Sequence, residues 1–139
     1  MAGAHNLQAD VETVHWGFFD AQLPARIEIA SGDTITIETV SGWGGVVDVA
    51  LMTDAHRRVI TEHKRGMGPH ILTGPVAVKG AQPGHTLEVR IKAIELTADW
   101  GWMLRHPLKG ALPEDFPDND ARCFPIDRAR MTAKLPWGP

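Results

Sequence analysis

The chain of 139 residues contains no tyrosine and a single cysteine, Cys123. One cysteine cannot form an internal disulfide or a multi-cysteine zinc site, so we expect a reducing compartment, the cytoplasm. Lysine and arginine total 14 against 17 aspartate and glutamate, a net charge of −3 without the basic stripe that binds nucleic acid. No apolar run approaches the roughly 20 residues of a membrane helix, and the start lacks a secretory signal pattern. We therefore expect a protein that binds neither nucleic acid nor membrane.

Glycine, proline and tryptophan are plentiful instead, with 14, 10 and 5 residues. This composition favours a sheet-dominated chain with many turns over a helical bundle. The length suits a single domain, which we expect over residues 1–139. The predicted fold class is mainly β, an antiparallel β-sandwich or barrel-like sheet with one short helix. The proline-rich C-terminal segment, residues 97–139, is expected to be irregular.

Apolar and polar residues alternate in three runs, which is typical of strands with one buried and one wet face. Two of the runs flank a Ser-Gly-Asp turn at residues 31–33, so residues 25–40 are predicted to form a β-hairpin. The third run follows a Pro-Gly step and predicts strand, turn and strand over residues 76–79, 80–84 and 86–96.

One helix is predicted after Thr53, whose side chain suits an N-cap. Val59 lies on the apolar face of this helix, and Gly66 is a suitable residue to end it. His56 and His63 share a face but lie about 10 Å apart, which is too far for one metal ion.

Residues 13–20 form an aromatic segment that contains His15, Trp16 and Gly17. Two interpretations stay open. In the first, the segment is a strand that lines a cleft, where His15 carries protons, donates a hydrogen bond or binds a metal. In the second, it is a buried aromatic strand with a satisfied histidine. Gly17 marks a position where a ligand or another backbone segment approaches closely.

Residues 68–76 are bracketed by two Gly-Pro steps, which fix a non-repetitive path of the backbone. The segment either holds His70 and Thr73 tightly in a site or forms a rigid crossover between sheets. Glu38 lies on the polar face of its predicted strand, where a solvated side chain is a simpler interpretation than a catalytic carboxylate.

Two motifs are distinctive: Thr-Gly-Pro-Val at residues 73–76 and Gly-Ala-Gln-Pro-Gly-His at residues 80–85. Glu-Thr-Val-His-Trp-Gly at residues 12–17 and Asp-Trp-Gly-Trp at residues 99–102 accompany them. In this order and spacing they resemble the acetamidase/formamidase family. The resemblance extends over nearly the whole chain, and it is to the N-terminal half of the considerably longer family members.

The resemblance implies a mostly β architecture and metal-dependent hydrolysis of short aliphatic amides, formamide and acetamide, to a carboxylate and ammonia. The resemblance also implies a divalent metal cofactor, with zinc as the first candidate. Most of its ligands and the catalytic carboxylate of family members are expected in Gly-Gly-Asn-Met-Asp and Gly-Asp-x-His-Ala segments of the second half, which this sequence lacks. Within this chain the metal ligands are unknown, with His15 as a candidate.

The site residues follow from the same resemblance. Catalytic roles are expected for His15, Glu38 and His70, and substrate-binding roles for Trp16, Thr73 and Gly74. The expected partners are a small amide substrate, a separate chain that supplies the missing half, and further copies of this chain in a homo-oligomer. The alternative is a non-catalytic β module for small-molecule binding or subunit assembly, and the isolated chain is expected to be inactive.

Overall fold

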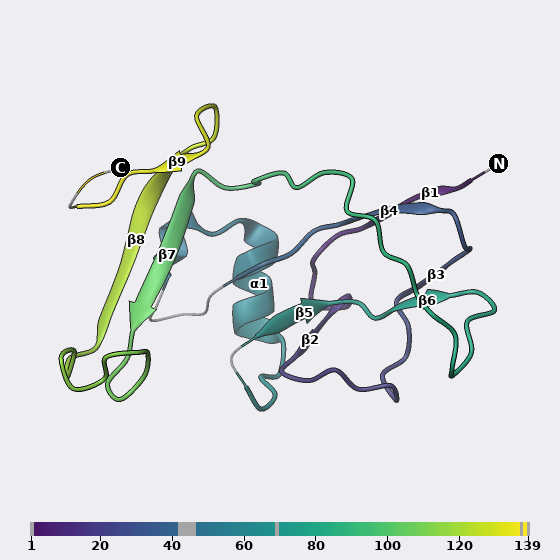
Figure 1. Ribbon diagram of the computed structural model, residues 1–139, viewed down its shortest axis with the longest axis horizontal. Coiled ribbons are helices and arrows are strands. Elements are labelled where there is room, and N and C mark those ends of the chain that lie inside the picture. Colours follow the sequence, from purple (N-terminus) through teal and green to yellow (C-terminus); the bar gives the residue numbers. More distant parts are fainter. Residues whose placement is uncertain (1, 42–46, 69, 137, 139) are drawn as a thin grey trace. The chain divides into compact units, whose positions relative to one another are not determined.

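The computed structural model describes residues 2–41, 47–68, 70–136 and 138 (Figure 1). Strands predominate in this part of the chain, with one short α-helix and several small sheets, so the predicted mainly-β fold is confirmed. The helical elements are α1 (Asp54–Glu62) and the 3-10 helix η1 (Val49–Leu51). The strands are β1 (Ala4–Leu7), β2 (Val14–Trp16), β3 (Ile27–Ile29), β4 (Thr34–Ile37), β5 (Ile71–Thr73), β6 (Val76–Val78), β7 (Trp100–Arg105), β8 (Asp120–Asp127) and β9 (Thr132–Ala133).

The chain groups into two compact units. Unit 1 comprises Met1–Gly42 and Thr53–Val89, and unit 2 comprises Trp43–Met52 and Arg90–Pro139. Each unit contains its own sheets. The single domain expected over residues 1–139 stays a prediction.

The described strands of unit 1 form three pairs, β1–β4, β2–β5 and β3–β6. The pairs β1–β4 and β3–β6 are parallel, whereas β2–β5 is antiparallel. The β-hairpin predicted over residues 25–40 is therefore wrong, because β3 and β4 both form but pair with different strands. The turn between them is present, with the amide of Asp33 donating to the carbonyl of Ala30 over 3.1 Å.

The carboxylate of Asp33 explains why β4 lies beside β1. It accepts hydrogen bonds from the amides of Gly3 over 2.6 Å and Ala30 over 2.9 Å. The Nε2 atom of His5 lies 2.8 Å from the same carboxylate. These contacts, the Ala30 amide first, lower the pKa of Asp33 to about 2. The turn is thus fastened to the N-terminal segment, and the next residue, Thr34, donates to the carbonyl of Gly3 over 2.9 Å.

Helix α1 begins where the sequence predicts. Thr53 is its N-cap, and the Thr53 hydroxyl accepts a hydrogen bond from the amide of His56 over 3.2 Å. The helix ends before the predicted Gly66, because the backbone of His63 is already extended. No described helix is long and apolar enough to cross a membrane.

The hydrophobic core of unit 1 is a small cluster. Val14 from β2 and Val59 from α1 are fully buried and pack with Ala9. Val40 and Ile71 pack against this cluster. The core therefore places α1 against β2 and β5, the two strands that carry or directly flank most of the predicted site residues.

Residues 85–98 form neither helix nor strand, so the strand predicted over residues 86–96 is wrong. The turn before them is as predicted: Gly84 has a φ of +90°, and the amide of His85 donates to the carbonyl of Gln82 over 3.0 Å. Alternating apolar and polar residues make a segment suitable for a sheet, but a strand also needs a neighbour. No described segment pairs with this one.

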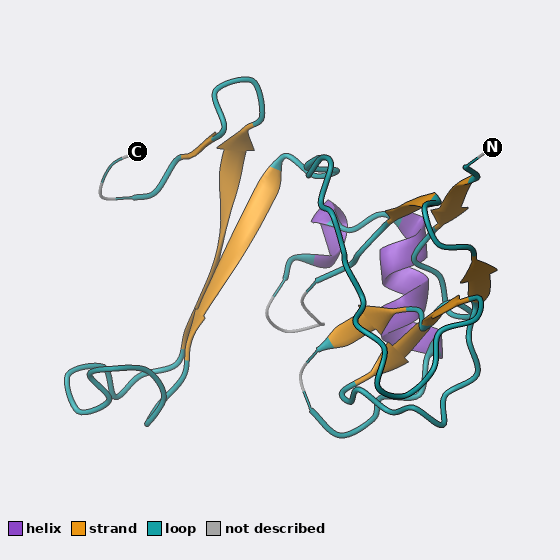
Figure 2. Ribbon diagram, turned by 45° about the vertical axis from the view of Figure 1, so that its right-hand side comes forward, coloured by secondary structure: helices purple, strands orange, loops and turns teal. Residues whose placement is uncertain are grey.

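Unit 2 is built around a hairpin of two long antiparallel strands, β7 and β8, to which β9 is added (Figure 2). The irregular segment predicted for residues 97–139 is therefore wrong. Most of its prolines lie outside strands, where they are tolerated. Pro125 lies at the last pair, opposite Trp100, and the amide of Ile126 donates to the carbonyl of Asp99 over 2.8 Å in its place.

Candidate functional site

Strands β2 and β5 bring most of the predicted site residues together. Their antiparallel register places Val14 opposite Thr73 and Trp16 opposite Ile71. Gly74 follows β5 directly, and its amide donates to the carbonyl of Thr13 over 2.8 Å. We call the set of residues His15, Trp16, His70, Thr73 and Gly74 the β2–β5 corner.

The ring of His15 lies between two carbonyl groups. Its Nδ1 atom is 3.3 Å from the carbonyl oxygen of Gly74, and its Nε2 atom is 3.1 Å from that of Phe18. A neutral imidazole has one N–H, so only the protonated ring donates to both carbonyls. Of the two interpretations of residues 13–20, these contacts favour the second, in which the ring nitrogens of His15 already have partners within the chain. The ring would bind a metal only if one of these contacts opened.

Trp16, the last residue of β2, joins this strand to the segment that precedes His70. The Nε1 atom of its buried indole donates to the carbonyl of Gly68 over 2.7 Å. The guanidinium of Arg65 lies 5.7 Å from the centre of the ring, within the range of a cation–π contact. Since its one polar group is engaged, Trp16 can offer a ligand only apolar surface.

Gly17 marks a close approach of two backbone segments. Its φ is +96°, and a Cβ atom at this position would lie 1.7 Å from the carbonyl oxygen of Met67. The amide of Gly17 also donates to the carbonyl of His70 over 2.9 Å. Of the two possibilities raised by the sequence, the neighbour of Gly17 is another backbone segment. Met67 and His70 are thereby held at the end of β2.

The segment after His70 is a crossover between sheets, since β5 pairs with β2 and β6 pairs with β3. Thr73 is half-buried within it. The side chain of His70 is exposed, and its ring makes no hydrogen bond to any described residue. His70 is therefore the residue of the corner whose imidazole is open to a small molecule.

Glu38 lies on a different strand pair. It follows β4, and its amide donates to the carbonyl of Leu7 over 2.9 Å. Its carboxylate Oε2 accepts a hydrogen bond from the amide of Ala9 over 3.2 Å. The carboxylate therefore closes the end of the β1–β4 pair, and no described hydrogen bond or ion pair joins it to the β2–β5 corner.

The sequence does not reveal the role of His63, just after α1. Its Nε2 atom lies 3.1 Å from the carbonyl oxygen of Val14, and its Nδ1 atom lies 3.0 Å from that of Lys64. Like His15, this ring lies between two carbonyl groups. No local pattern marks such a contact, because it depends on the packing of α1 against β2.

A zinc site needs at least three protein ligands. The described part of the chain contains no group of three His, Cys, Asp or Glu side chains that could hold a metal ion. The candidate ligand His15 is engaged with two carbonyl groups. These residues therefore do not fit a complete metal centre.

The family model of the acetamidase/formamidase family matches residues 4–134 of the chain. The chain belongs to this family. The match includes every residue of the β2–β5 corner and confirms the resemblance found in the motifs. No curated protein and no solved structure matches the chain.

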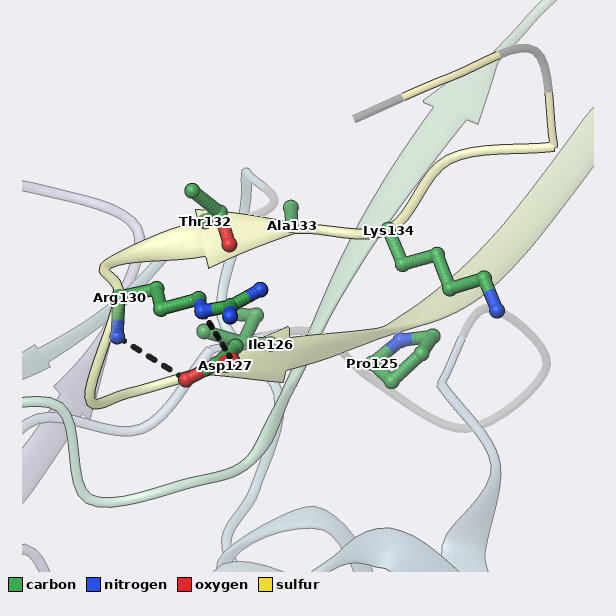
Figure 3. A pocket seen from close by; sticks show the side chains of 7 residues that line it. All are labelled: Pro125, Ile126, Asp127, Arg130, Thr132, Ala133 and Lys134. Atoms are coloured by element: carbon green, nitrogen blue, oxygen red, sulfur yellow. Dashed lines mark hydrogen bonds and ion pairs between the residues drawn. The ribbon is translucent and has the colours of Figure 1, made fainter.

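This acetamidase/formamidase family chain also has a pocket of about 330 Å³ in unit 2, at the turn between β8 and β9 (Figure 3). The pocket is lined by Pro125, Ile126, Asp127, Arg130, Thr132, Ala133 and Lys134. Asp127 accepts a hydrogen bond from the amide of Arg130 over 2.9 Å, and its carboxylate lies 3.9 Å from the Arg130 guanidinium. None of the predicted site residues lines this pocket, so it is not the predicted amide site.

Proposed function

We propose that this family member takes part in the hydrolysis of short aliphatic amides, formamide and acetamide, to a carboxylate and ammonia. The observation that carries the proposal is the family match over residues 4–134. The β2–β5 corner supports it, because five residues expected at an amide site lie on or beside one strand pair. A cytoplasmic location belongs to the same proposal, since the exposed thiol of Cys123 stays reduced there.

The corner has groups that suit a small amide. The Thr73 hydroxyl can donate to an amide carbonyl or accept from an amide N–H. Gly74 is buried, and its amide and carbonyl are engaged with Thr13 and His15, so its proposed part is to leave room beside Thr73 by lacking a side chain. Trp16 is buried, so its proposed part is to contribute only its small exposed edge to the apolar surface beside a short alkyl group. The exposed imidazole of His70 is the proposed proton carrier for the leaving nitrogen, the usual task of a general acid.

His15 and Glu38 take supporting parts in the proposal. His15 fixes the carbonyl of Gly74 and so acts as a positioning residue. Glu38 holds the amide of Ala9, at the end of the β1–β4 pair. A direct catalytic role of either residue requires these contacts to open when substrate or a partner binds.

The family membership adds a divalent metal to the proposal, with zinc as the first candidate. The described residues lack a three-ligand group, so we expect most ligands outside them, in residues that correspond to the second half of the longer family members. When bound, the metal would polarise the amide carbonyl and activate water. No residue of the described chain is assigned to it.

A non-catalytic β module is the second candidate function. The engagement of both His15 ring nitrogens favours it, as does the lack of a three-ligand group among the described residues. In this case the corner binds a small molecule or another subunit without hydrolysing it.

Two measurements separate these functions. The chain is titrated with acetamide while the nuclear magnetic resonance signals of His70 and Thr73 are followed. Ammonia release is then measured after adding zinc and the second half of a longer family member. We expect shifted signals, and ammonia release that His70→Gln lowers at least about tenfold. His106→Gln, at an exposed histidine of unit 2, is the matched control and leaves the rate unchanged.

Shifted signals without ammonia release in the reconstituted mixture would support the non-catalytic module. Unshifted signals together with no ammonia release would contradict both functions of the corner.

A further inference from the structure

The pocket at the turn between β8 and β9 shares no residue with the β2–β5 corner. Its volume of about 330 Å³ is at the lower end of the range of small-molecule sites, roughly 300–1,000 Å³. Two basic side chains, Arg130 and Lys134, line it together with one acidic side chain, Asp127. The lining therefore has one positive charge in excess, which favours an anion over a cation.

The pairing of β8 with β9 gathers polar side chains on one face of the hairpin. Asp127 lies opposite Thr132, and the ladder continues beyond β9, where the amide of Lys134 donates to the carbonyl of Pro125 over 3.0 Å. Side chains that are two positions apart on a strand, or directly opposite on its neighbour, point to the same face. The hydroxyl of Thr132 and the ammonium group of Lys134 are therefore neighbours, and the ring of Pro125 is the apolar side chain beside them.

The turn adds Arg130 to this set. Asp127 fixes the turn, because its carboxylate accepts a hydrogen bond from the amide of Arg130 over 2.9 Å. The other oxygen of the carboxylate lies 3.9 Å from the Nε atom of the Arg130 guanidinium, which is too long for a hydrogen bond (Figure 3). The guanidinium is thus attracted to Asp127 but keeps its N–H donors for another acceptor.

The other two donors of the pocket are also unused. Within the part of the chain that the structure describes, the Lys134 ammonium group and the Thr132 hydroxyl make no hydrogen bond or ion pair. One pocket is therefore lined by a guanidinium, an ammonium group and a hydroxyl that can all donate to the same ligand.

We propose that this pocket binds a short aliphatic carboxylate. The carboxylate oxygens accept hydrogen bonds from Arg130, Thr132 and Lys134. The alkyl chain lies against the ring of Pro125 and the aliphatic stem of Lys134. A planar carboxylate matches the fork of a guanidinium, and a single negative charge balances the single excess positive charge. This inference goes beyond the proposed function, because it needs neither hydrolysis nor any predicted site residue.

Titration of the full chain with sodium butyrate at constant ionic strength tests the binding by nuclear magnetic resonance. The amide signals of Arg130, Thr132 and Lys134 are expected to shift and to saturate. Butyramide has the same shape without the charge and is expected to leave these signals unchanged. Signals of His70 and Thr73 report on the amide site separately, so failure of one proposal is distinguishable from failure of the other.

Three results of the titration would overturn the proposal. Shifts that grow without saturation would show that there is no site. Equal shifts with butyramide would show that the pocket does not recognise an anion. Tighter binding of inorganic phosphate than of butyrate would show that the apolar part of the pocket has no role.

Loss of single donors tests which residues hold the carboxylate. Lys134→Gln and Arg130→Gln are each expected to raise the dissociation constant of butyrate at least about threefold, because each removes a charged donor. Lys109→Gln is the matched control, since it removes the same charge from an exposed loop of unit 2 and leaves the dissociation constant unchanged. Equal losses at Lys109 and Lys134 would show a general attraction by positive charge and contradict a site at the turn.

Discussion

The amide of Gly17 donates to the carbonyl of His70, while the Gly17 Cα faces the carbonyl oxygen of Met67 so closely that a Cβ atom would lie 1.7 Å from it. The opposing atom belongs to the backbone and cannot swing aside as a flexible side chain would. The φ of +96° is also costly for any residue with a side chain. The geometry of the corner therefore depends on glycine at this position.

Gly17→Ala is expected to lower the free energy of unfolding by about 3 kcal/mol, because overlap and backbone strain act together. Gly80→Ala is the matched control. Gly80 has a φ of +80°, but a Cβ atom there would meet no other atom within 4 Å, so only strain of about 1 kcal/mol remains. Urea unfolding followed by tryptophan fluorescence measures both variants. Equal losses would show that the contact with Met67 is not present in solution.

Stability is expected to fall as the carboxylate of Asp33 is protonated. Its pKa is lowered from 3.8 to about 2 by the amides of Ala30 and Gly3 and by His5. A lowered pKa stabilises the fold above pH 3.8, and this contribution disappears as the pH falls through about 2. Asp33→Asn should therefore unfold at a lower temperature near neutral pH and lose less stability over this acid range.

Thermal unfolding recorded by circular dichroism between neutral and acid pH tests this expectation for Asp33. Asp115→Asn, at an exposed loop position, serves as the control and should follow the unmodified chain. If Asp33→Asn and the unmodified chain lose stability in parallel, the hydrogen bonds to the carboxylate do not fasten the turn.

His15 is expected to matter for stability and His70 to matter little. His15→Ala removes two contacts to main-chain carbonyls and should cost about 1–2 kcal/mol of unfolding free energy. His15→Gln keeps one donor group and should lose about half as much. His70→Ala changes an exposed ring and should leave the unfolding free energy nearly unchanged. Chemical denaturation measures all three, and a loss at His70 as large as at His15 would reverse their proposed roles.

The chain alone is not expected to hydrolyse acetamide or to gain stability from zinc. The described residues offer no three-ligand group, and binding of a metal to the folded state would raise the melting temperature. Thermal unfolding with zinc and with a chelator should therefore give the same midpoint. A zinc-dependent increase in the midpoint, or ammonia release by the 139-residue chain, would contradict this expectation.

Helix and strand positions were easier to predict than strand partners. Thr53 caps α1 as predicted because capping is a local contact within one turn. The runs that become β3 and β4 were also found, yet both pair elsewhere. Alternation reports which face of a strand is buried but not its partner, and the contact of Asp33 with the distant Gly3, which fastens β4 beside β1, has no local signal in the sequence. Pro125 likewise suggested irregular structure, although the end of a ladder tolerates it.

Much of the candidate site could be located from sequence motifs, since residues 68–76 and 13–20 do meet in the β2–β5 pair. The hydrogen bonds within this site could not be predicted from the motifs. Both nitrogens of His15 face carbonyl groups from different segments, and nothing in its neighbours along the chain specifies them. The contact of Glu38 could not be predicted either. Its carboxylate accepts a hydrogen bond from the amide of Ala9, which follows β1, and β1 is the partner of β4.

The described strand pairs of unit 1 join distant parts of the chain: Ala4 pairs with Thr34, Ile27 with Val76, and Val14 with Thr73. Long loops must close before any of these pairs can form, and their entropy is lost before contacts compensate for it. Unit 1 therefore has a high contact order, which slows folding. While the nascent chain waits for these closures, its strand edges stay exposed, so its yield on refolding depends on how dilute it is kept.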